Sequence, residues 1–266
     1  MLAESAAHFA SLAPRTCGET GNGSCAWYHG SWQCFRLIDL VSNPDWHAEF
    51  YQRWLPPATA PAEVRALVSG TSDYTMPAYV LDALGEARRS VTVVDRCPTP
   101  LIACEWMAER LGVALATEHA DVRDFRHGEF DLVCSDSFLS RSNGESRSAL
   151  LDAWHALLAP GGRAVTTIRV LDPDIPVDRR ETLVDSFVQT AVASWEPFQR
   201  DTRIPIPTVA RLAEEYAAHA VDYELDTSEG VRKALDERFR IVHWETADSP
   251  NGAWRGRYVR VVLQKS

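Results

Sequence analysis

This chain has no long apolar run, few basic residues relative to acidic ones, and a start that does not resemble a leader peptide. No apolar run approaches the ~20 residues that a helix needs to cross a bilayer, so we expect no membrane partner. The opening MLAESAAHFASLAP has neither a basic stretch nor a long apolar core, so we expect no secretory signal and a cytoplasmic location. The formal net charge is -10, and an acidic surface repels phosphate backbones. We therefore expect no nucleic-acid partner.

Cysteine pairs with metal-ligand spacing are also missing. The six cysteines include no C-x-x-C pair, so the spacing predicts no metal site. In a cytosol their thiols are expected to stay reduced. Cys104 and Cys134 lie in apolar runs, which favours a place in the core.

Glycine is scarce where a nucleotide-binding loop would use it. The stretch Arg65–Arg96 opens with a short apolar run that ends at Gly70, and it closes with a β-branched run that ends on Asp95. An amphipathic segment lies between the two runs. This order of strand, tight loop, helix, strand and acid is typical of the first half of a βαβ unit, which places a nucleotide at the carboxyl ends of its strands. The loop has one glycine where two or three are expected.

Strands and helices continue to alternate after this stretch. The expected strands are nearly all apolar, as in a parallel sheet that is buried on both faces. Such alternation predicts a doubly wound α/β sheet. Strands are expected over 65–69, 90–95, 114–118, 130–135 and 162–168, helices over 75–87, 98–111 and 145–158, and two closing strands over 240–246 and 257–263, joined through the hairpin signal Ser249-Pro250-Asn251-Gly252.

Helical segments flank this pattern. Residues 1–24 are expected to be loosely ordered, and helical spacing begins in the aromatic-rich segment 27–55. A proline-rich break at 56–61 then divides an N-terminal helical lid region, 1–60, from an α/β domain, 61–266, with a helical insertion at about 171–236. In the insertion, helices are expected over 177–195, 208–220 and 228–237. The predicted fold is therefore a Rossmann-like, doubly wound, mostly parallel sheet with a closing antiparallel strand, an N-terminal helical region and a helical insertion.

Four places in this order resemble the class I S-adenosylmethionine-dependent methyltransferases, over about residues 60–170 and the closing strands at 238–264. They are Leu67-Val68-Ser69-Gly70-Thr71-Ser72-Asp73 at the glycine-rich loop, Val93-Val94-Asp95 at the ribose acid, Ala120-Asp121-Val122-Arg123-Asp124-Phe125 at the adenine turn, and the run from Phe130 to Asp136 with Leu157-Leu158-Ala159-Pro160-Gly161-Gly162 at the fourth strand and its L-x-P-G-G turn. The last pair is the most specific. The resemblance implies a methyltransferase with S-adenosyl-L-methionine as cofactor.

The resemblance assigns roles in the first two of these places. Asp95 is expected to accept hydrogen bonds from both ribose hydroxyls, and the alternative is that it caps the helix at 98–111. Gly70 is expected to let the chain approach the cofactor without a Cβ. Ser72 and Asp73 either contact the amino and carboxylate groups of the methionine moiety or cap the helix at 75–87. Arg96 either lies over the adenine face or faces water.

The other two places carry further candidate residues. The Asp121 carboxylate and the Val122 amide are expected to bind the adenine, with a solvated loop aspartate as the alternative. Ser135 and Asp136 end the fourth strand, where the reactive methyl group is expected. Asp136 is the candidate for orienting or deprotonating the acceptor, and the alternative is a helix cap or an outer hydrogen bond.

The aromatic segment Trp27-Tyr28-His29-Gly30-Ser31-Trp32 has two interpretations. It forms a lid over the cofactor, in which Tyr28 and His29 are the candidate catalytic contacts, since aromatic faces attract cations such as a sulfonium. Alternatively, Trp27 and Trp32 pack the helical region onto the sheet.

These features leave three alternative functions open. The first is transfer of a methyl group from S-adenosylmethionine to an oxygen or nitrogen of a small-molecule acceptor. The alternative is a catalytically silent methyltransferase-like domain for binding or assembly, which the sequence G-T-S-D favours because the family has G-x-G-x-G there. A nicotinamide cofactor on the same sheet is a third reading. A homodimer through the helical parts stays open.

Overall fold

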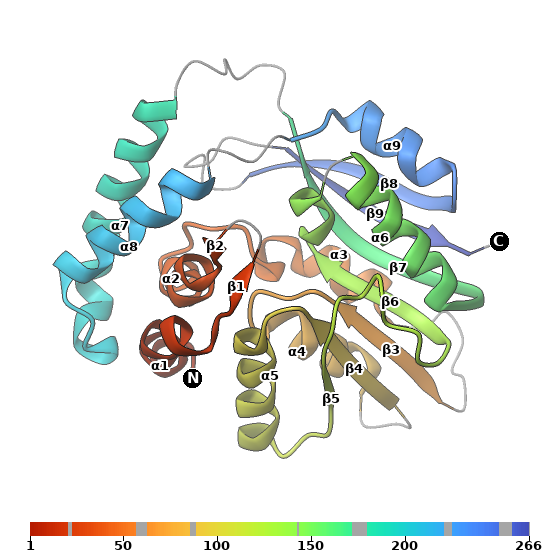
Figure 1. Cartoon of the computed structure of the whole chain (residues 1–266), viewed down its shortest axis with the longest axis horizontal. Coiled ribbons are helices and arrows are strands. Elements are labelled where there is room, and N and C mark those ends of the chain that lie inside the picture. The colour runs from red at the N-terminus through yellow and green to blue at the C-terminus, as the bar shows by residue number, and fades with distance from the viewer. Residues whose placement is uncertain are drawn as a thin grey trace.

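The structure is a computed structural model that describes residues 1–20, 23–56, 63–85, 89–142, 144–171, 180–220, 225–249 and 257–265. Its centre is a seven-stranded sheet with the order β5-β4-β3-β6-β7-β9-β8 (Figure 1). Strands β3 to β7 run parallel to one another, and β9 runs antiparallel to both β7 and β8. The strands are β3 (Val64–Ser69), β4 (Arg89–Asp95), β5 (Ala116–His119), β6 (Phe130–Asp136), β7 (Leu158–Val170), β8 (Arg240–Asp248) and β9 (Arg257–Gln264). The predicted fold class is confirmed.

Helices cover both faces of the sheet because its central strands are apolar on both sides. Along β3, Ala66 and Val68 face one core with α1, α3, α4 and α5, whereas Leu67 faces another with α6 and α9. This is the two-residue alternation of a strand. These helices are α1 (Leu2–Thr16), α3 (Ala48–Trp54), α4 (Thr75–Leu84), α5 (Pro98–Leu111), α6 (Gly144–Leu157) and α9 (Ser228–Asp236). None of the helices in the described ranges is long and apolar enough to cross a membrane.

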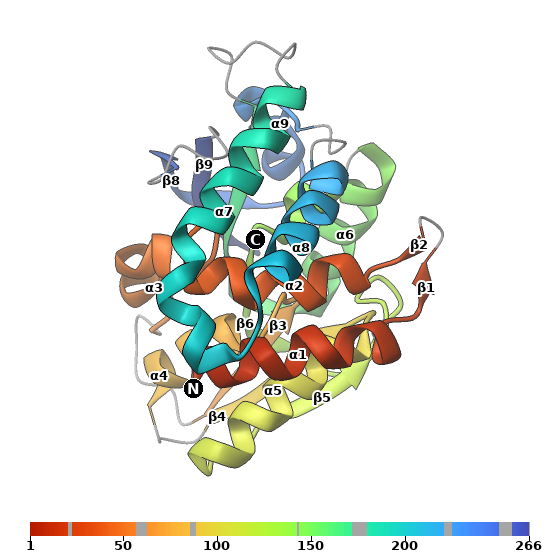
Figure 2. The same ribbon diagram turned by 90° about the vertical axis from the view of Figure 1, so that its left-hand side faces the viewer.

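A third core lies outside the sheet, between helices of the N-terminal region and of the insertion. It joins α1 and α2 (Ala26–Leu37) to α7 (Arg180–Thr202) and α8 (Ile206–Ala220). Figure 2 shows these four helices together on one side of the molecule, and α2 contacts α8 directly. The expected insertion and N-terminal region are therefore packed against each other. The short elements are a hairpin, β1 (Glu19–Thr20) and β2 (Gly23–Ser24), and two 3-10 helices, η1 (Pro44–His47) and η2 (Phe138–Arg141).

The expectation of a loosely ordered start is wrong, because α1 occupies most of it. Its buried face is Ser5, Ala6, Phe9 and Ala13, so small residues form most of the inward stripe and the apolar periodicity is weak. A proline in a helix suggests a break, but Pro14 lies in the last turn of α1, and the helix ends two residues later at Thr16.

Most element boundaries agree with the sequence within a few residues, and the differences occur at turns. Strand β7 begins at Leu158, earlier than expected, and therefore includes the Pro160-Gly161-Gly162 turn, where Gly161 has φ +74°. Helix α7 continues to Thr202. Helix α4 ends at Leu84, earlier than expected, where Gly85 follows it with φ +63°. The proline-rich junction after Pro56, the start of the helix expected at 177 and the hairpin turn after Ser249 lie outside the described residues.

Candidate active site

A cavity of about 900 Å³ lies where β3, β4 and β6 end. Its floor includes Gly70, Asp95 and Asp136, each at or just after a strand end. The strand order reverses at β3, with β4 on one side and β6 on the other, and ligands of open α/β sheets bind at such a switch point. Tyr28, His29 and Trp32 of helix α2 line the cavity.

Most of the predicted site residues come together around this cavity. The ones that line it are Tyr28, His29, Gly70, Ser72, Asp95, Arg96 and Asp136, whereas Asp73, Asp121, Val122 and Ser135 do not line it. The residues that line it come from four separate parts of the chain, as the parallel topology requires.

Gly70 is the one residue of its loop that the backbone restricts to glycine. Its φ is +68°, which L side chains rarely adopt, and its N–H donates to the carbonyl of Val94 over 2.9 Å. An added Cβ would lie 2.6 Å from the ring of Phe138. A single glycine therefore suffices for both the turn and the close approach of the aromatic ring.

The Asp95 carboxylate is held in place by two backbone N–H donors, and Asp95 is not the cap residue of α5. One carboxylate oxygen accepts the N–H of Thr71 over 2.9 Å, and the other accepts the N–H of Cys97 over 2.8 Å. The residue that precedes α5 in the cap position is Cys97, so the predicted alternative of a helix cap is not what the structure shows. Burial raises the pKa of Asp95, although His29 and the two backbone donors oppose this effect. Each carboxylate oxygen retains a further lone pair for a ligand in the cavity.

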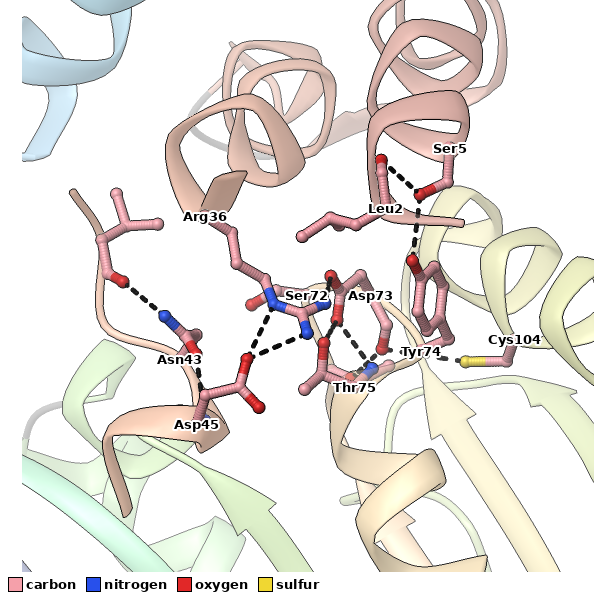
Figure 3. Close-up of polar contacts among 12 residues, drawn as sticks. Leu2, Ser5, Arg36, Asn43, Asp45, Ser72, Asp73, Tyr74, Thr75 and Cys104 are labelled. Atoms are coloured by element: carbon pink, nitrogen blue, oxygen red, sulfur yellow. Dashed lines mark hydrogen bonds and ion pairs between the residues drawn. The ribbon is translucent and has the colours of Figure 1, made fainter. Parts of the chain in front are cut away.

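Asp73 is held by polar contacts within the protein, just before α4. Its carboxylate accepts the N–H of Thr75 at the start of α4 over 2.8 Å, and it pairs with Arg36 of α2 over 3.1 Å (Figure 3). Arg36 also pairs with Asp45 over 3.0 Å. The neighbouring Ser72 shares a hydrogen bond of 2.6 Å with the hydroxyl of Tyr28. Polar contacts with α2 thus hold the loop that follows Gly70, the loop that has only one glycine.

Asp121 and Val122 do not line the cavity and are engaged elsewhere. Two nitrogens of Arg123 bond the Asp121 carboxylate, which lowers its pKa, and Arg96 lies 3.6 Å away. The Val122 side chain is buried in the core beside α6. His119, which the sequence did not single out, lines the cavity and bonds the carbonyl of Arg96 over 3.0 Å.

Asp136 is held by two hydroxyl groups. Tyr51 of α3 and Thr167 of β7 both donate to its Oδ1, each over 2.8 Å. Burial raises the pKa of Asp136 to about 6, and the two hydroxyl donors oppose this rise. The preceding Ser135 is fully buried and hydrogen-bonds Thr166 over 2.8 Å, so its side chain serves the sheet.

Both tryptophans of the aromatic segment pack in the third core, among helices, and not onto the sheet as one interpretation expected. Trp27 stacks on His219 of α8 with ring centroids 4.5 Å apart, which is packing, whereas Trp32 also lines the cavity. Tyr28 also lies against an aromatic ring of α8, that of Tyr216, with 6.1 Å between centroids.

Sequence reasoning missed several residues that line or support the cavity. Tyr51 was seen only as part of a helix, and no spacing pointed it at Asp136. Tyr216 of α8 and Tyr258 of β9 line the cavity from segments far apart in the sequence. Arg141 lines it as well, with its guanidinium carbon 4.4 Å from the ring centre of Tyr28. For Tyr216, the aromatic residues of the expected insertion were the nearest sequence signal of a place in the cavity wall.

Three cysteines meet beside the cavity. The sulfurs of Cys17, Cys25 and Cys97 all lie within 4.8 Å of one another. Contacts with the other two sulfurs lower the pKa of the Cys97 thiol, and interaction with Cys25 and Cys97 raises the pKa of His29 to about 10 against the effect of burial. Linear spacing gave no sign of this cluster. Cys104 and Cys134 are buried in the core, as predicted.

Comparisons with known proteins agree with the fold. A family model described as "Methyltransferase domain" matches residues 75–166. A comparison with curated protein sequences finds no match. Among solved structures, the N-methyltransferase NodS from Bradyrhizobium japonicum, in complex with S-adenosyl-L-homocysteine, is 14% identical with a TM-score of 0.50, over 87% of this chain and 98% of that one.

Two further structures are similar. The 1,6-didemethyltoxoflavin-N1-methyltransferase from Burkholderia thailandensis is 15% identical with a TM-score of 0.51, over 85% of this chain and 92% of that one. The [4+2]-cyclase SpnF is 14% identical with a TM-score of 0.55, over 99% of this chain and 91% of that one. At such identities these likenesses show the fold. The family model shows a methyltransferase domain over residues 75–166, and the chain has the fold of the methyltransferase structures that it resembles.

Proposed function

We propose that this protein transfers the methyl group of S-adenosylmethionine to an oxygen or nitrogen of a small-molecule acceptor bound in the 900 Å³ cavity. The observation that carries the proposal is the placement of two carboxylates, Asp95 and Asp136, at strand ends on either side of β3 and under the aromatic cover of α2. The volume lies in the upper part of the ~300–1,000 Å³ typical of small-molecule sites. It is large enough for a cofactor and an acceptor together.

The residues beside Asp95 fit the cofactor chemically. A vicinal diol donates two hydrogen bonds, and a carboxylate fixed by backbone N–H groups accepts both without reorganising. Arg96 and His119 line the same end of the cavity, where a flat base has room to lie. When bound, S-adenosylmethionine supplies an electrophilic methyl group on a sulfonium.

The residues beside Asp136 fit the acceptor. A base with a pKa of about 6 is ionised at neutral pH and still accepts a proton from a hydroxyl or an ammonium group. Tyr51 and Thr167 fix one oxygen of its carboxylate, so the carboxylate is oriented before the acceptor arrives. Asp136 takes the acceptor proton as the new bond forms, and positioning supplies most of the remaining rate.

The walls of the cavity favour a flat, largely apolar acceptor. Trp32, Tyr216, Tyr258 and Phe138 present aromatic rings to it. Tyr28 and His29 supply the polar groups of the cover, although Tyr28 already bonds Ser72. The similar Burkholderia structure holds 1,6-didemethyltoxoflavin, which supports a small-molecule acceptor.

Calorimetry with S-adenosylmethionine and S-adenosylhomocysteine tests the proposal, followed by mass spectrometry of small-molecule fractions incubated with the enzyme and labelled cofactor. Binding of both ligands and a product that gains one methyl group support it. No binding at millimolar ligand would favour the silent binding domain instead. Binding without any methylated product would favour other chemistry on the same fold, as the likeness to a cyclase illustrates.

A further inference from the structure

We propose that Cys17, Cys25 and Cys97, together with His29, bind a zinc ion that fastens the N-terminal helices to the cofactor end of the sheet. The binding of the ion does not depend on the proposed methyl transfer. Its consequence for the cover of the cavity does rest on that function.

The sulfur geometry is that of a metal site. The Sγ atoms of Cys25 and Cys97 are 3.5 Å apart, and those of Cys97 and Cys17 are 3.6 Å apart. A tetrahedral zinc ion with Zn–S bonds of ~2.3 Å holds its sulfurs about 3.8 Å apart. All six cysteines are free thiols in the structure, so the three sulfurs are close without a disulfide between them.

His29 is the candidate for the fourth ligand. It lies four residues after Cys25, the residue just before α2, and residues at this spacing share one face of a helix. Its Nδ1 is buried with no hydrogen-bond partner in the described part of the chain. Neither ring nitrogen lies within 4.8 Å of all three sulfurs, so the ring shifts towards them when it coordinates the ion. Coordination would satisfy this buried nitrogen.

The chemistry of the ligands selects zinc. Thiolates and imidazole suit zinc, and three cysteines with one histidine form a common closed structural set. Binding releases three protons from the cluster to solvent, and three thiolates with a neutral imidazole give the zinc site a net charge of -1. Hydroxyl groups already contact the cluster: the Thr99 hydroxyl lies 3.0 Å from the Cys17 sulfur and 2.7 Å from the Thr16 hydroxyl.

The position of the ligands gives the ion its structural effect. Cys17 follows α1, Cys25 comes just before α2, and the β1–β2 hairpin lies between them. Cys97 comes two residues after Asp95 and is the residue just before α5. One ion would therefore join both N-terminal helices to the loop that carries the proposed ribose acid, and it would hold His29 and Tyr28 over the cavity.

Zinc content and cobalt spectroscopy on the full chain test this proposal. Fully reduced apo-protein is titrated with Zn²⁺ while stability is followed by thermal unfolding, and with Co²⁺ while spectra are recorded. We expect stoichiometric binding, a raised unfolding temperature, and the sulfur-to-cobalt charge-transfer and intense visible bands of a tetrahedral thiolate site. X-ray absorption of the zinc protein is expected to show three sulfurs and one nitrogen.

Variants separate this site from other thiols. Cys17→Ser, Cys25→Ser and Cys97→Ser are each expected to abolish stoichiometric binding, whereas Cys34→Ala, which removes a buried cysteine outside the cluster, keeps it. His29→Ala is expected to weaken binding at least about tenfold. Reduced, folded wild-type protein that binds neither metal, or a zinc shell of oxygen and nitrogen alone, would overturn the proposal even where the cysteine variants do not fold. Unchanged affinity in His29→Ala would remove His29 from the ligand set.

Discussion

The hydroxyl of Tyr51 donates a hydrogen bond to the carboxylate of Asp136 over 2.8 Å, and so links α3 of the N-terminal region to the end of β6. Phe50 of the same helix, and Leu55 just after it, belong to the core that α4 and α5 share with the sheet. The N-terminal region is thus part of the site's construction. The division of the chain near residue 60 stays a prediction.

Removing the Tyr51 hydroxyl should shift the acid limb of the pH profile. The hydrogen bond favours ionised Asp136, so Tyr51→Phe is expected to raise the pKa of Asp136 above about 6. A loss of about 1 kcal/mol corresponds to roughly 0.7 pH units. The measurement is kcat/KM for methyl transfer against pH, with Tyr79→Phe as a control at a tyrosine that bonds Asp45 instead. A limb that stays in place would show that Asp136 is not the titrating base.

Neutralising Asp136 should stabilise the protein while it removes activity. Because the folded-state pKa is raised from 3.8 to about 6, folded protein binds the proton more tightly than unfolded protein between these values. The carboxyl group therefore contributes stability below about pH 4, and this contribution is lost as the pH rises through 6.

Asp136→Asn is accordingly expected to be more stable than the wild type by about 1–2 kcal/mol near pH 8, with a smaller difference near pH 4. Its methyl transfer should fall by about 10²–10⁴-fold. Urea unfolding at both pH values and steady-state kinetics check the two parts. A variant that is destabilised equally at both pH values would contradict the electrostatic explanation.

Gly70 and Gly161 form a matched pair for testing the tight loop. Both have positive φ, +68° and +74°, but a Cβ at Gly70 would meet the ring of Phe138, whereas nothing lies within 4 Å at Gly161. Gly161→Ala should cost about 1 kcal/mol of unfolding free energy from backbone strain alone, and Gly70→Ala at least about 1 kcal/mol more.

The double variant Gly70→Ala with Phe138→Ala removes the steric contact and keeps the backbone strain. Its cost, relative to Phe138→Ala alone, is expected to fall to that of Gly161→Ala. Urea unfolding of the set supplies the comparison. An equal cost for both single glycine variants would mean that the aromatic ring moves aside freely.

The sheet was predictable because its signals are local. Strands β3 and β6 are apolar runs, and α5 has the predicted bounds because Pro98 begins it and Gly112, in the left-handed conformation, follows it. Helix α1 was not predictable in the same way, since its buried face consists mostly of alanine and serine.

The candidate site was predictable only in part. Strand-end residues such as Asp95 and Asp136 could be placed, because parallel strands end at a common edge. The pairing of Asp73 with Arg36, the contact of Tyr51 with Asp136 and the meeting of Cys17 with Cys97 each join segments distant in sequence. No spacing rule encodes such contacts, since they depend on how the N-terminal helices pack.

The most direct test of the central claim is calorimetry of S-adenosylhomocysteine with the wild type, Asp95→Ala and Asp131→Ala. Asp131 lies at the start of β6, where it accepts the N–H of Arg65 and does not line the cavity. We expect Asp95→Ala to weaken binding by about 2 kcal/mol or more, roughly 30-fold, because it loses charge-assisted hydrogen bonds to the ribose, and Asp131→Ala to match the wild type. Unchanged affinity in a folded Asp95→Ala protein would contradict the assignment of the cofactor site.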